Sequence, residues 1–246
     1  MVLETAPAGG ESRSGATKLA CGEVAVARRR GLFGCGSLSD AEGEPLRPGG
    51  LALTRELIGL ANFRSGEAVV DVGCGLGASV RLLGARGVAA VGVDLVSPPG
   101  GPAGAPFIVA DAARLPFADA SLDGVLSECS LSLAVDRRET LVEWFRVLNR
   151  GGRLALSDLY CRAGEGVGRI ASRETLCLEI AAAGFRVSRF EDRSETLKGW
   201  TARFIFRHGS LDALWSGDWA IEGEATKLGY CALVAVKPGA SQSGGG

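Results

Sequence analysis

The sequence predicts an α/β fold built on a mostly parallel sheet, and two observations support this prediction. Short runs of β-branched and other apolar residues alternate with segments of helical periodicity, as in strands joined by crossover helices. One run, in residues 69–78 (VVDVGCGLGA), leads directly into three closely spaced glycines, as a strand does when it turns into a helix beside a ligand. The chain has 246 residues, 46% of them hydrophobic, which is enough to fill one large core.

The expected elements alternate between strand and helix. The glycine turn is expected to join a strand at residues 68–72 to a helix at about 77–85. Asp136 and Glu139 form a capping box at the start of a later helix, which the glycines within residues 150–152 are expected to end. The remaining strands are expected at residues 88–94, 106–111, 122–128, 153–160, 185–190 and 229–237, and a further helix at 173–183.

Charge and cysteine content restrict the class of protein. The net charge is −1, so the chain lacks the basic balance by which proteins bind nucleic acid. No apolar run reaches the ~18 residues that a membrane span needs, and the polar N-terminus differs from a secretory signal. The seven cysteines are odd in number and have no C-x-x-C spacing, which favours free thiols. We therefore expect a soluble, cytoplasmic protein with no structural metal and no nucleic-acid partner.

The glycine turn agrees with two classes of cofactor. Gly73, Gly75 and Ala78 satisfy the G-x-G-x-x-G/A pattern of dinucleotide-binding oxidoreductases. Asp71 and Gly77 extend the same glycines to D-x-G-x-G-x-G, the pattern of the class I S-adenosylmethionine-dependent methyltransferases. A sulfonium cofactor has no phosphate and favours a carboxylate near its positively charged methionyl end, which Asp71 supplies. A dinucleotide oxidoreductase is therefore the less favoured alternative.

Two segments downstream decide between these classes. Residues 108–128 (IVADAARLPFADASLDGVLSE) and 147–158 (VLNRGGRLALSD), taken with the glycine turn, resemble the class I methyltransferases over about residues 48–160. The resemblance is greatest to the small-molecule branch related to ubiquinone-biosynthesis enzymes. It implies a Rossmann-like, seven-stranded, mostly parallel sheet with helices on both faces. It also implies S-adenosylmethionine as the cofactor and methyl transfer to a small-molecule acceptor.

The resemblance assigns the cofactor contacts to the ends of three strands. On the methionyl side they are Asp71, Gly73, Gly75 and Gly77. At the ribose and adenine they are Asp94, Leu95, Asp111 and Ala112. Asp94 can accept hydrogen bonds from both ribose hydroxyls, and Asp111 from the adenine amino group.

The domain organisation follows from the same resemblance and from composition. Residues 61–238 are expected to form the methyltransferase domain, and residues 19–60 a lid over its site. Residues 1–18 and 239–246 are polar and rich in glycine and serine, so we expect them to be disordered. The oligomeric state is left open.

The acceptor is expected to lie near Cys129, which follows the fourth strand in the segment SECSLSL. A thiolate at this place would need no general base, and it is a soft ligand. Cys129 and Cys35, the latter in GLFGCGSLSD, give the chain a partial resemblance to arsenite methyltransferases, with Cys21 further upstream. The resemblance implies that these thiolates hold a thiol-bound or metalloid substrate. An ordinary organic acceptor is the favoured reading, and both cysteines are catalytic candidates.

Two further observations bear on the reaction. The chain lacks the Asn/Asp-Pro-Pro-aromatic turn of enzymes that methylate adenine or glutamine nitrogen, so that class is disfavoured. His208, the only histidine, is expected in a loop with a surface or capping role rather than as a base. A methyltransferase-like module that binds the cofactor without turnover is the remaining alternative.

Overall fold

A computed structural model describes residues 47–239, except 98–100, 102–103, 168–169 and 210–226. The expected disordered segment 1–18, most of the expected lid, Cys21 and Cys35 lie outside the described residues. So does the C-terminal tail from residue 240.

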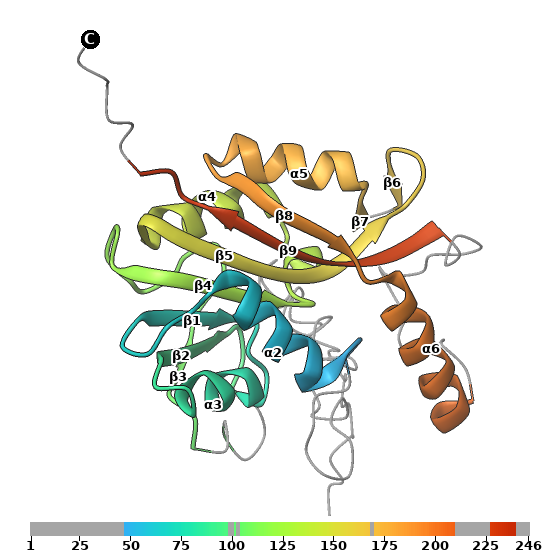
Figure 1. The fold of residues 1–246 in the computed structure, drawn as a ribbon, viewed down its shortest axis with the longest axis horizontal. Helices are drawn as coiled ribbons and strands as arrows, with labels where there is room; N and C mark the ends of the chain where they lie inside the picture. The colour runs from blue at the N-terminus through green and yellow to red at the C-terminus, as the bar shows by residue number, and fades with distance from the viewer. Residues whose placement is uncertain (1–46, 98–100, 102–103, 168–169, 210–226, 240–246) are drawn as a thin grey trace, which may run out of the picture.

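A seven-stranded sheet with the order β3-β2-β1-β4-β5-β9-β8 forms the centre of the fold (Figure 1). Its strands are β1 (Ala68–Val72), β2 (Ala89–Asp94), β3 (Phe107–Val109), β4 (Leu122–Glu128), β5 (Leu148–Cys161), β8 (Arg186–Asp192) and β9 (Leu228–Val236). Only β9 runs antiparallel to its neighbours in this sheet. The expectation of a Rossmann-like, mostly parallel sheet of seven strands is confirmed. A short hairpin of β6 (Gly166–Val167) and β7 (Ile170–Ala171) forms a separate two-stranded sheet beside the end of β5.

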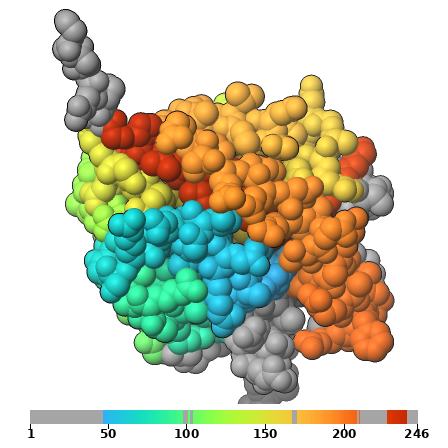
Figure 2. Space-filling model, in the orientation of Figure 1, coloured from blue at the N-terminus to red at the C-terminus, as the bar shows by residue number. Residues whose placement is uncertain are grey.

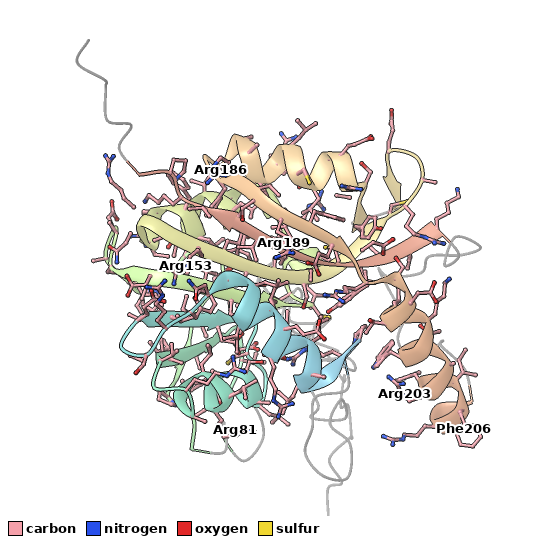
Figure 3. All side chains as sticks on the ribbon, in the orientation of Figure 1. Arg81, Arg153, Arg186, Arg189, Arg203 and Phe206 are labelled. Atoms are coloured by element: carbon pink, nitrogen blue, oxygen red, sulfur yellow. The ribbon has the colours of Figure 1, made fainter. Side chains whose placement is uncertain are left out.

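Helices cover both faces of the sheet (Figure 1), and their side chains fill the space between helices and strands (Figure 3). They are α2 (Gly50–Ala61), α3 (Ala78–Gly84), α4 (Arg137–Val147), α5 (Arg173–Ala182) and α6 (Ser194–His208), with a 3-10 turn, η1, at Leu131–Leu133. On one face, Leu57 of α2 and Leu83 of α3 share a core with Leu126 of β4. On the other face, Trp144 of α4 and Ile180 of α5 are buried in a second core. The two cores arise because successive residues of a strand point to opposite faces.

The structure corrects the expected end of the helix that Asp136 begins. Asp136 caps α4 as predicted, accepting hydrogen bonds from two backbone N–H groups of the first turn. However, α4 ends at Val147, and the RGG segment lies inside β5. Gly151 adopts a φ of 79°, which allows a register shift at the start of β5 before regular pairing with β4 resumes at Arg153.

Helix α2 was expected only as part of the lid, yet it packs on the sheet. It begins at Gly50 after Gly49, both with positive φ, and no side chain caps it. Arg193, which precedes α6, forms an ion pair with Glu56 of α2 at 3.0 Å. The start of α6 therefore lies beside α2 on the surface (Figure 2). His208 is the last residue of α6 rather than part of a loop. Within the described part of the chain, no helix is long and apolar enough to cross a bilayer.

Candidate active site

A row of polar side chains lies at one end of the central strands, on one face of the sheet. The register of the strands places these residues on the face that α2 and α3 cover, beyond the apolar residues of the core. They are Asp94 on β2, Asp71 on β1, Glu128 on β4, Ser157 on β5 and Tyr230 on β9. Ligands of parallel α/β sheets bind outside the carboxyl ends of the strands. The row therefore lies where such a fold is expected to hold its ligand.

The glycine turn lies beside this row and leaves the backbone accessible. Gly73, Gly75 and Gly77 all adopt positive φ values, of 77°, 50° and 73°. A Cβ atom on Gly73 would lie 2.4 Å from the Cβ atom of Ser130, so that position accepts only glycine. A Cβ atom on Gly75 would meet no described residue within 4 Å, so the backbone is open on that side to a ligand. The turn is thus closely packed at Gly73, against Ser130 beyond the end of β4, and accessible to a ligand at Gly75.

Asp94 connects the second strand to the glycine turn. Its carboxylate accepts hydrogen bonds from the backbone N–H of Gly75 at 2.9 Å and of Leu95 at 2.8 Å. Each carboxylate oxygen keeps a lone pair for a further donor. Asp94 is therefore held in one orientation and can still accept from a diol.

The residues expected at the adenine lie in a turn rather than in a strand. The third strand ends at Val109, so Asp111 lies two residues beyond it, where the prediction had extended the strand. Asp111 is exposed and accepts a hydrogen bond from the N–H of Ala113 at 3.0 Å. The carbonyl oxygen of Ala112 accepts from the indole of Trp144 at 3.1 Å, which fixes this turn against α4.

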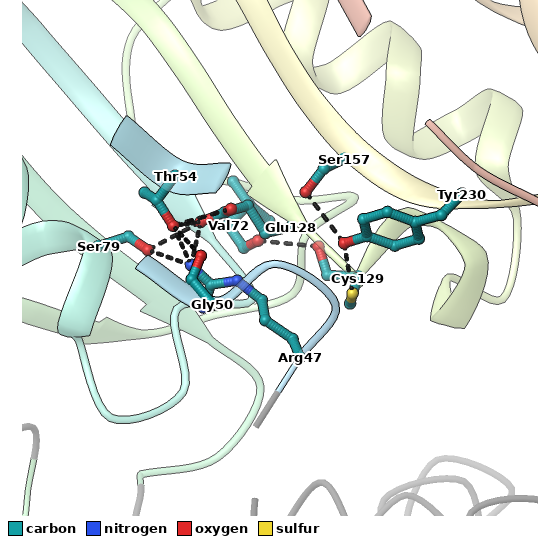
Figure 4. Close-up of polar contacts among 10 residues, drawn as sticks. Arg47, Gly50, Thr54, Val72, Ser79, Glu128, Cys129, Ser157 and Tyr230 are labelled. Atoms are coloured by element: carbon teal, nitrogen blue, oxygen red, sulfur yellow. Dashed lines mark hydrogen bonds and ion pairs between the residues drawn. The ribbon is translucent and has the colours of Figure 1, made fainter. Parts of the chain in front are cut away.

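A buried ion pair that the sequence analysis missed joins four elements at the row (Figure 4). The Nη2 atom of Arg47 donates to Glu128 at 2.5 Å, to the hydroxyl of Thr54 at 2.5 Å and to that of Ser79 at 3.0 Å. The hydroxyls of Ser79 and Thr54 in turn donate to the Glu128 carboxylate, at 2.8 and 3.1 Å. The segment before α2 is thereby tied to α2, α3 and β4. No sequence pattern marks Arg47, because Glu128 is 81 residues away.

Asp71 differs from its neighbours because no described residue donates a hydrogen bond to it. Its side chain is 3% exposed, and no described residue forms a hydrogen bond with its carboxyl group. Burial, and then the negative charge of Glu128, raises the pKa of Asp71 to about 8, although Arg47 opposes the shift. Asp71 is therefore largely protonated at pH 7 in the absence of a bound cation.

Cys129 has strained backbone geometry and a neutral thiol. Its φ is 55°, which is uncommon for a residue other than glycine. Its Sγ atom lies 2.9 Å from the hydroxyl of Tyr230, which donates to the hydroxyl of Ser157 at 3.1 Å. Burial, followed by the charge of Asp158, raises the pKa of the thiol to about 12. In the structure described the thiol stays protonated, because desolvation outweighs the opposing hydrogen bond with Tyr230. The catalytic role of Cys129 stays a prediction.

The other described cysteines do not join Cys129 in a ligand cluster. Cys74, inside the glycine turn, fills space above β2, since a Cβ atom on Gly92 would lie 2.5 Å from its Sγ atom. Cys161 and Cys231 are buried. Among the described residues, no group of three or more His, Cys, Asp or Glu side chains is arranged to hold a metal ion.

Comparison with known proteins shows the family to which this chain belongs. A family model described as a methyltransferase domain matches residues 70–156. The O-methyltransferase rstn1 of Aspergillus nomiae is 34% identical over 177 residues, which cover 62% of this chain and 78% of that protein. The chain belongs to the class I S-adenosylmethionine-dependent methyltransferases.

Two more methyltransferases extend the comparison. The 27-O-demethylrifamycin SV methyltransferase of Amycolatopsis mediterranei is 29% identical over 238 residues, which cover 81% of this chain and 88% of that protein. The structure of the Haemonchus contortus phosphoethanolamine N-methyltransferase 2 with S-adenosyl-L-methionine superposes with a TM-score of 0.64 at 19% identity. It covers 78% of this chain and 54% of that one, and it supports the fold. The partial resemblance to arsenite methyltransferases has no counterpart among these proteins.

The described residues fit the cofactor of this methyltransferase family. The glycine turn is open at Gly75, as close approach of a ligand requires. Three carboxyl groups end neighbouring strands against one guanidinium, which suits a positively charged sulfonium. The enzyme is thus an S-adenosylmethionine-dependent methyltransferase.

Proposed function

We propose that this methyltransferase transfers the methyl group to an oxygen atom of a small organic acceptor. The similarity to 27-O-demethylrifamycin SV methyltransferase carries the proposal, because it extends over most of both chains. The name of that relative, and that of rstn1, specify methylation of oxygen. The small-molecule acceptor is proposed in place of a nucleic acid, and the net charge of −1 supports this choice.

The cofactor is proposed to lie across the ends of β1, β2 and β3. Asp71, Gly73, Gly75 and Gly77 would hold its methionyl side, and Asp94, Leu95, Asp111 and Ala112 its ribose and adenine. The support for Asp94 is its fixed carboxylate, and for Gly75 its open backbone. Residues 61–238, together with α2 packed on their sheet, form the proposed catalytic domain. The part of the segment 19–60 that precedes Arg47 stays a proposed lid.

The chemistry requires orientation more than proton transfer by the protein. When bound, the cofactor supplies an electrophilic methyl group on a sulfonium. The protein has to hold the acceptor oxygen in line with that group and keep water away. Cys129, Tyr230 and Ser157 supply neutral hydrogen-bonding groups beside the carboxylates, and they would form one wall of the acceptor pocket. Cys129 therefore acts in this proposal as a wall residue and not as a nucleophile.

The sequence also suggested a more specific alternative, a thiol-bound or metalloid acceptor. It would require Cys129 to lose its proton on binding a thiophilic ligand, as coordinated thiols do, and to join Cys35, outside the described residues. The neutral thiol supports the organic acceptor instead. We also propose a cytoplasmic location, where the five free cysteines of the described residues would stay reduced.

The test is a measurement of S-adenosylhomocysteine release with a panel of acceptors. The full-length protein is incubated with S-adenosylmethionine and with phenols, aliphatic alcohols, primary amines or arsenite, and products are identified by mass spectrometry. We expect methyl ethers from hydroxylated acceptors. An Asp94→Ala variant is expected to be inactive with every acceptor, because it lacks the cofactor contact. Turnover with amines or arsenite alone would overturn the oxygen acceptor, and binding without turnover would favour the non-catalytic module.

A further inference from the structure

The carboxyl groups at the cofactor end differ in how their charges are compensated. Asp94 is occupied by two backbone N–H groups. Glu128 is paired with Arg47 and receives hydrogen bonds from two hydroxyls. Asp71 is buried, with 3% of its surface exposed, yet no described residue donates a hydrogen bond to it or forms an ion pair with it.

The register places Asp71 next to the paired carboxylate. Asp71 pairs with Leu126 across β1 and β4, and Glu128 lies two residues further along β4, on the same face. Two like charges at such neighbouring positions repel each other, and one guanidinium neutralises only one of them. The raised pKa of Asp71, about 8, agrees with this arrangement. Among the described residues, Arg47 balances Glu128 and two backbone N–H groups compensate Asp94, so Asp71 is the carboxyl group of the three that is left uncompensated.

The cofactor changes its charge during the reaction. The electron pair of the acceptor oxygen would form the new bond to the methyl carbon, while the electrons of the broken carbon–sulfur bond would remain on sulfur. The hydroxyl proton of the acceptor would pass to water. The sulfonium becomes a neutral thioether, so one positive charge leaves the neighbourhood of the carboxyl groups.

We propose that Asp71 is the specificity-determining residue that distinguishes the sulfonium cofactor from its thioether product. Its carboxyl group gives up a proton to solvent when the sulfonium form binds, and it takes one from water after the methyl group has left. The inference rests on the proposed placement of the cofactor at the end of β1. Arg47 and Glu128 act here as positioning residues, because together they set the charge next to Asp71.

The direction of the effect follows from proton linkage. A ligand that requires ionised Asp71 binds more tightly as the pH rises toward the pKa of the free enzyme, and its affinity then levels off. The gain is at most about tenfold per pH unit for one proton. The thioether binds with a smaller gain, because it can leave Asp71 protonated. The ratio of sulfonium to thioether affinity therefore rises between pH 6 and pH 8.

The test is calorimetric titration of the full-length protein with S-adenosylmethionine and S-adenosylhomocysteine, without an acceptor, at pH 6, 7, 8 and 9. We expect the affinity ratio of the two ligands to rise at least about fivefold from pH 6 to pH 8. In Asp71→Asn this rise should disappear. The α-amino groups of the ligands titrate equally in both proteins, so the difference between the proteins isolates Asp71. Arg47→Met should move the rise to higher pH.

A second measurement needs no variant at Asp71. The parent protein is titrated with 5′-dimethylthioadenosine, a sulfonium, and with 5′-methylthioadenosine, its thioether, neither of which has an α-amino group. Repeating the titration in two buffers of different ionisation enthalpy counts the protons released, and the sulfonium should release more. Equal proton counts, or the same pH dependence in parent and Asp71→Asn, would overturn the role of Asp71. Failure to bind S-adenosylmethionine or S-adenosylhomocysteine would instead overturn the proposed function.

Discussion

The hydroxyl of Ser130 donates a hydrogen bond to the carbonyl oxygen of Val72 at 2.8 Å. The same hydroxyl lies 2.6 Å from that of Ser127, so the end of β4 holds the end of β1 at the point where the glycine turn starts. This contact explains why Gly73, the next residue after Val72, has no room for a side chain.

Gly73→Ala is therefore expected to disrupt the turn. The added methyl group would lie 2.4 Å from Ser130 Cβ, and alanine is strained at a φ of 77°. We expect the affinity for S-adenosylhomocysteine, measured by calorimetry, to fall by more than about tenfold, which corresponds to 1.4 kcal/mol. Gly59→Ala is the matched control, because Gly59 lies in α2 with nothing within 4 Å of the added atom. It should leave binding unchanged. Equal binding by both variants would contradict this account of the turn.

Arg47→Met is expected to destabilise the whole domain. Glu128 would remain buried without its cation, since its side chain is 3% exposed. Removing one partner of a buried ion pair typically costs about 3–5 kcal/mol of unfolding free energy. Urea unfolding measures the loss. Lys198→Met, which breaks an exposed pair with Glu195, should change the same quantity by less than about 0.5 kcal/mol. A similar small change for both variants would mean that the buried pair is dispensable.

The central strands β1, β4 and β9 could be predicted from sequence because their residues are mostly apolar and buried. The start of α2 could not, because two glycines with positive φ begin it and no side chain caps it. The pairing of Arg47 with Glu128 depends on how the chain returns to the sheet after 81 residues. The place of Cys129 after the fourth strand could be predicted from the sequence. Its contact with Tyr230 could not, since that residue is 101 positions away.

Asp71 should make the ligand-free protein less stable as the pH rises. Its pKa is about 8 in the folded state and near 3.8 when unfolded, so between these values the folded state holds a proton that the unfolded state has lost. This contribution is fully present below about pH 4 and is lost progressively up to about pH 8. Urea unfolding of parent and Asp71→Asn at pH 5, 6, 7 and 8 measures it. The stability of the parent relative to the variant should fall with pH, and a constant difference would contradict the raised pKa.

Cys129→Ser is expected to leave methyl transfer to organic acceptors within about tenfold of the parent. A neutral thiol that donates to Tyr230 acts through its hydrogen bond and its volume, and a serine hydroxyl can donate the same bond. The thiol of the parent should also react slowly with iodoacetamide at pH 7 to 8, because its pKa is about 12 and the thiolate is the reactive form.

Tyr230→Phe separates this wall role from a thiolate mechanism. It removes the hydroxyl that links Cys129 to Ser157, and it should lower the unfolding free energy by about 1–3 kcal/mol, because polar groups are left buried without a partner. Alkylation rates and methyl transfer are measured for both variants beside the parent. Rapid alkylation of Cys129 at pH 7, with loss of all activity in Cys129→Ser, would show that the thiolate takes part in the reaction. Arsenite that protects Cys129 from alkylation would then identify a thiophilic ligand as the next acceptor to examine.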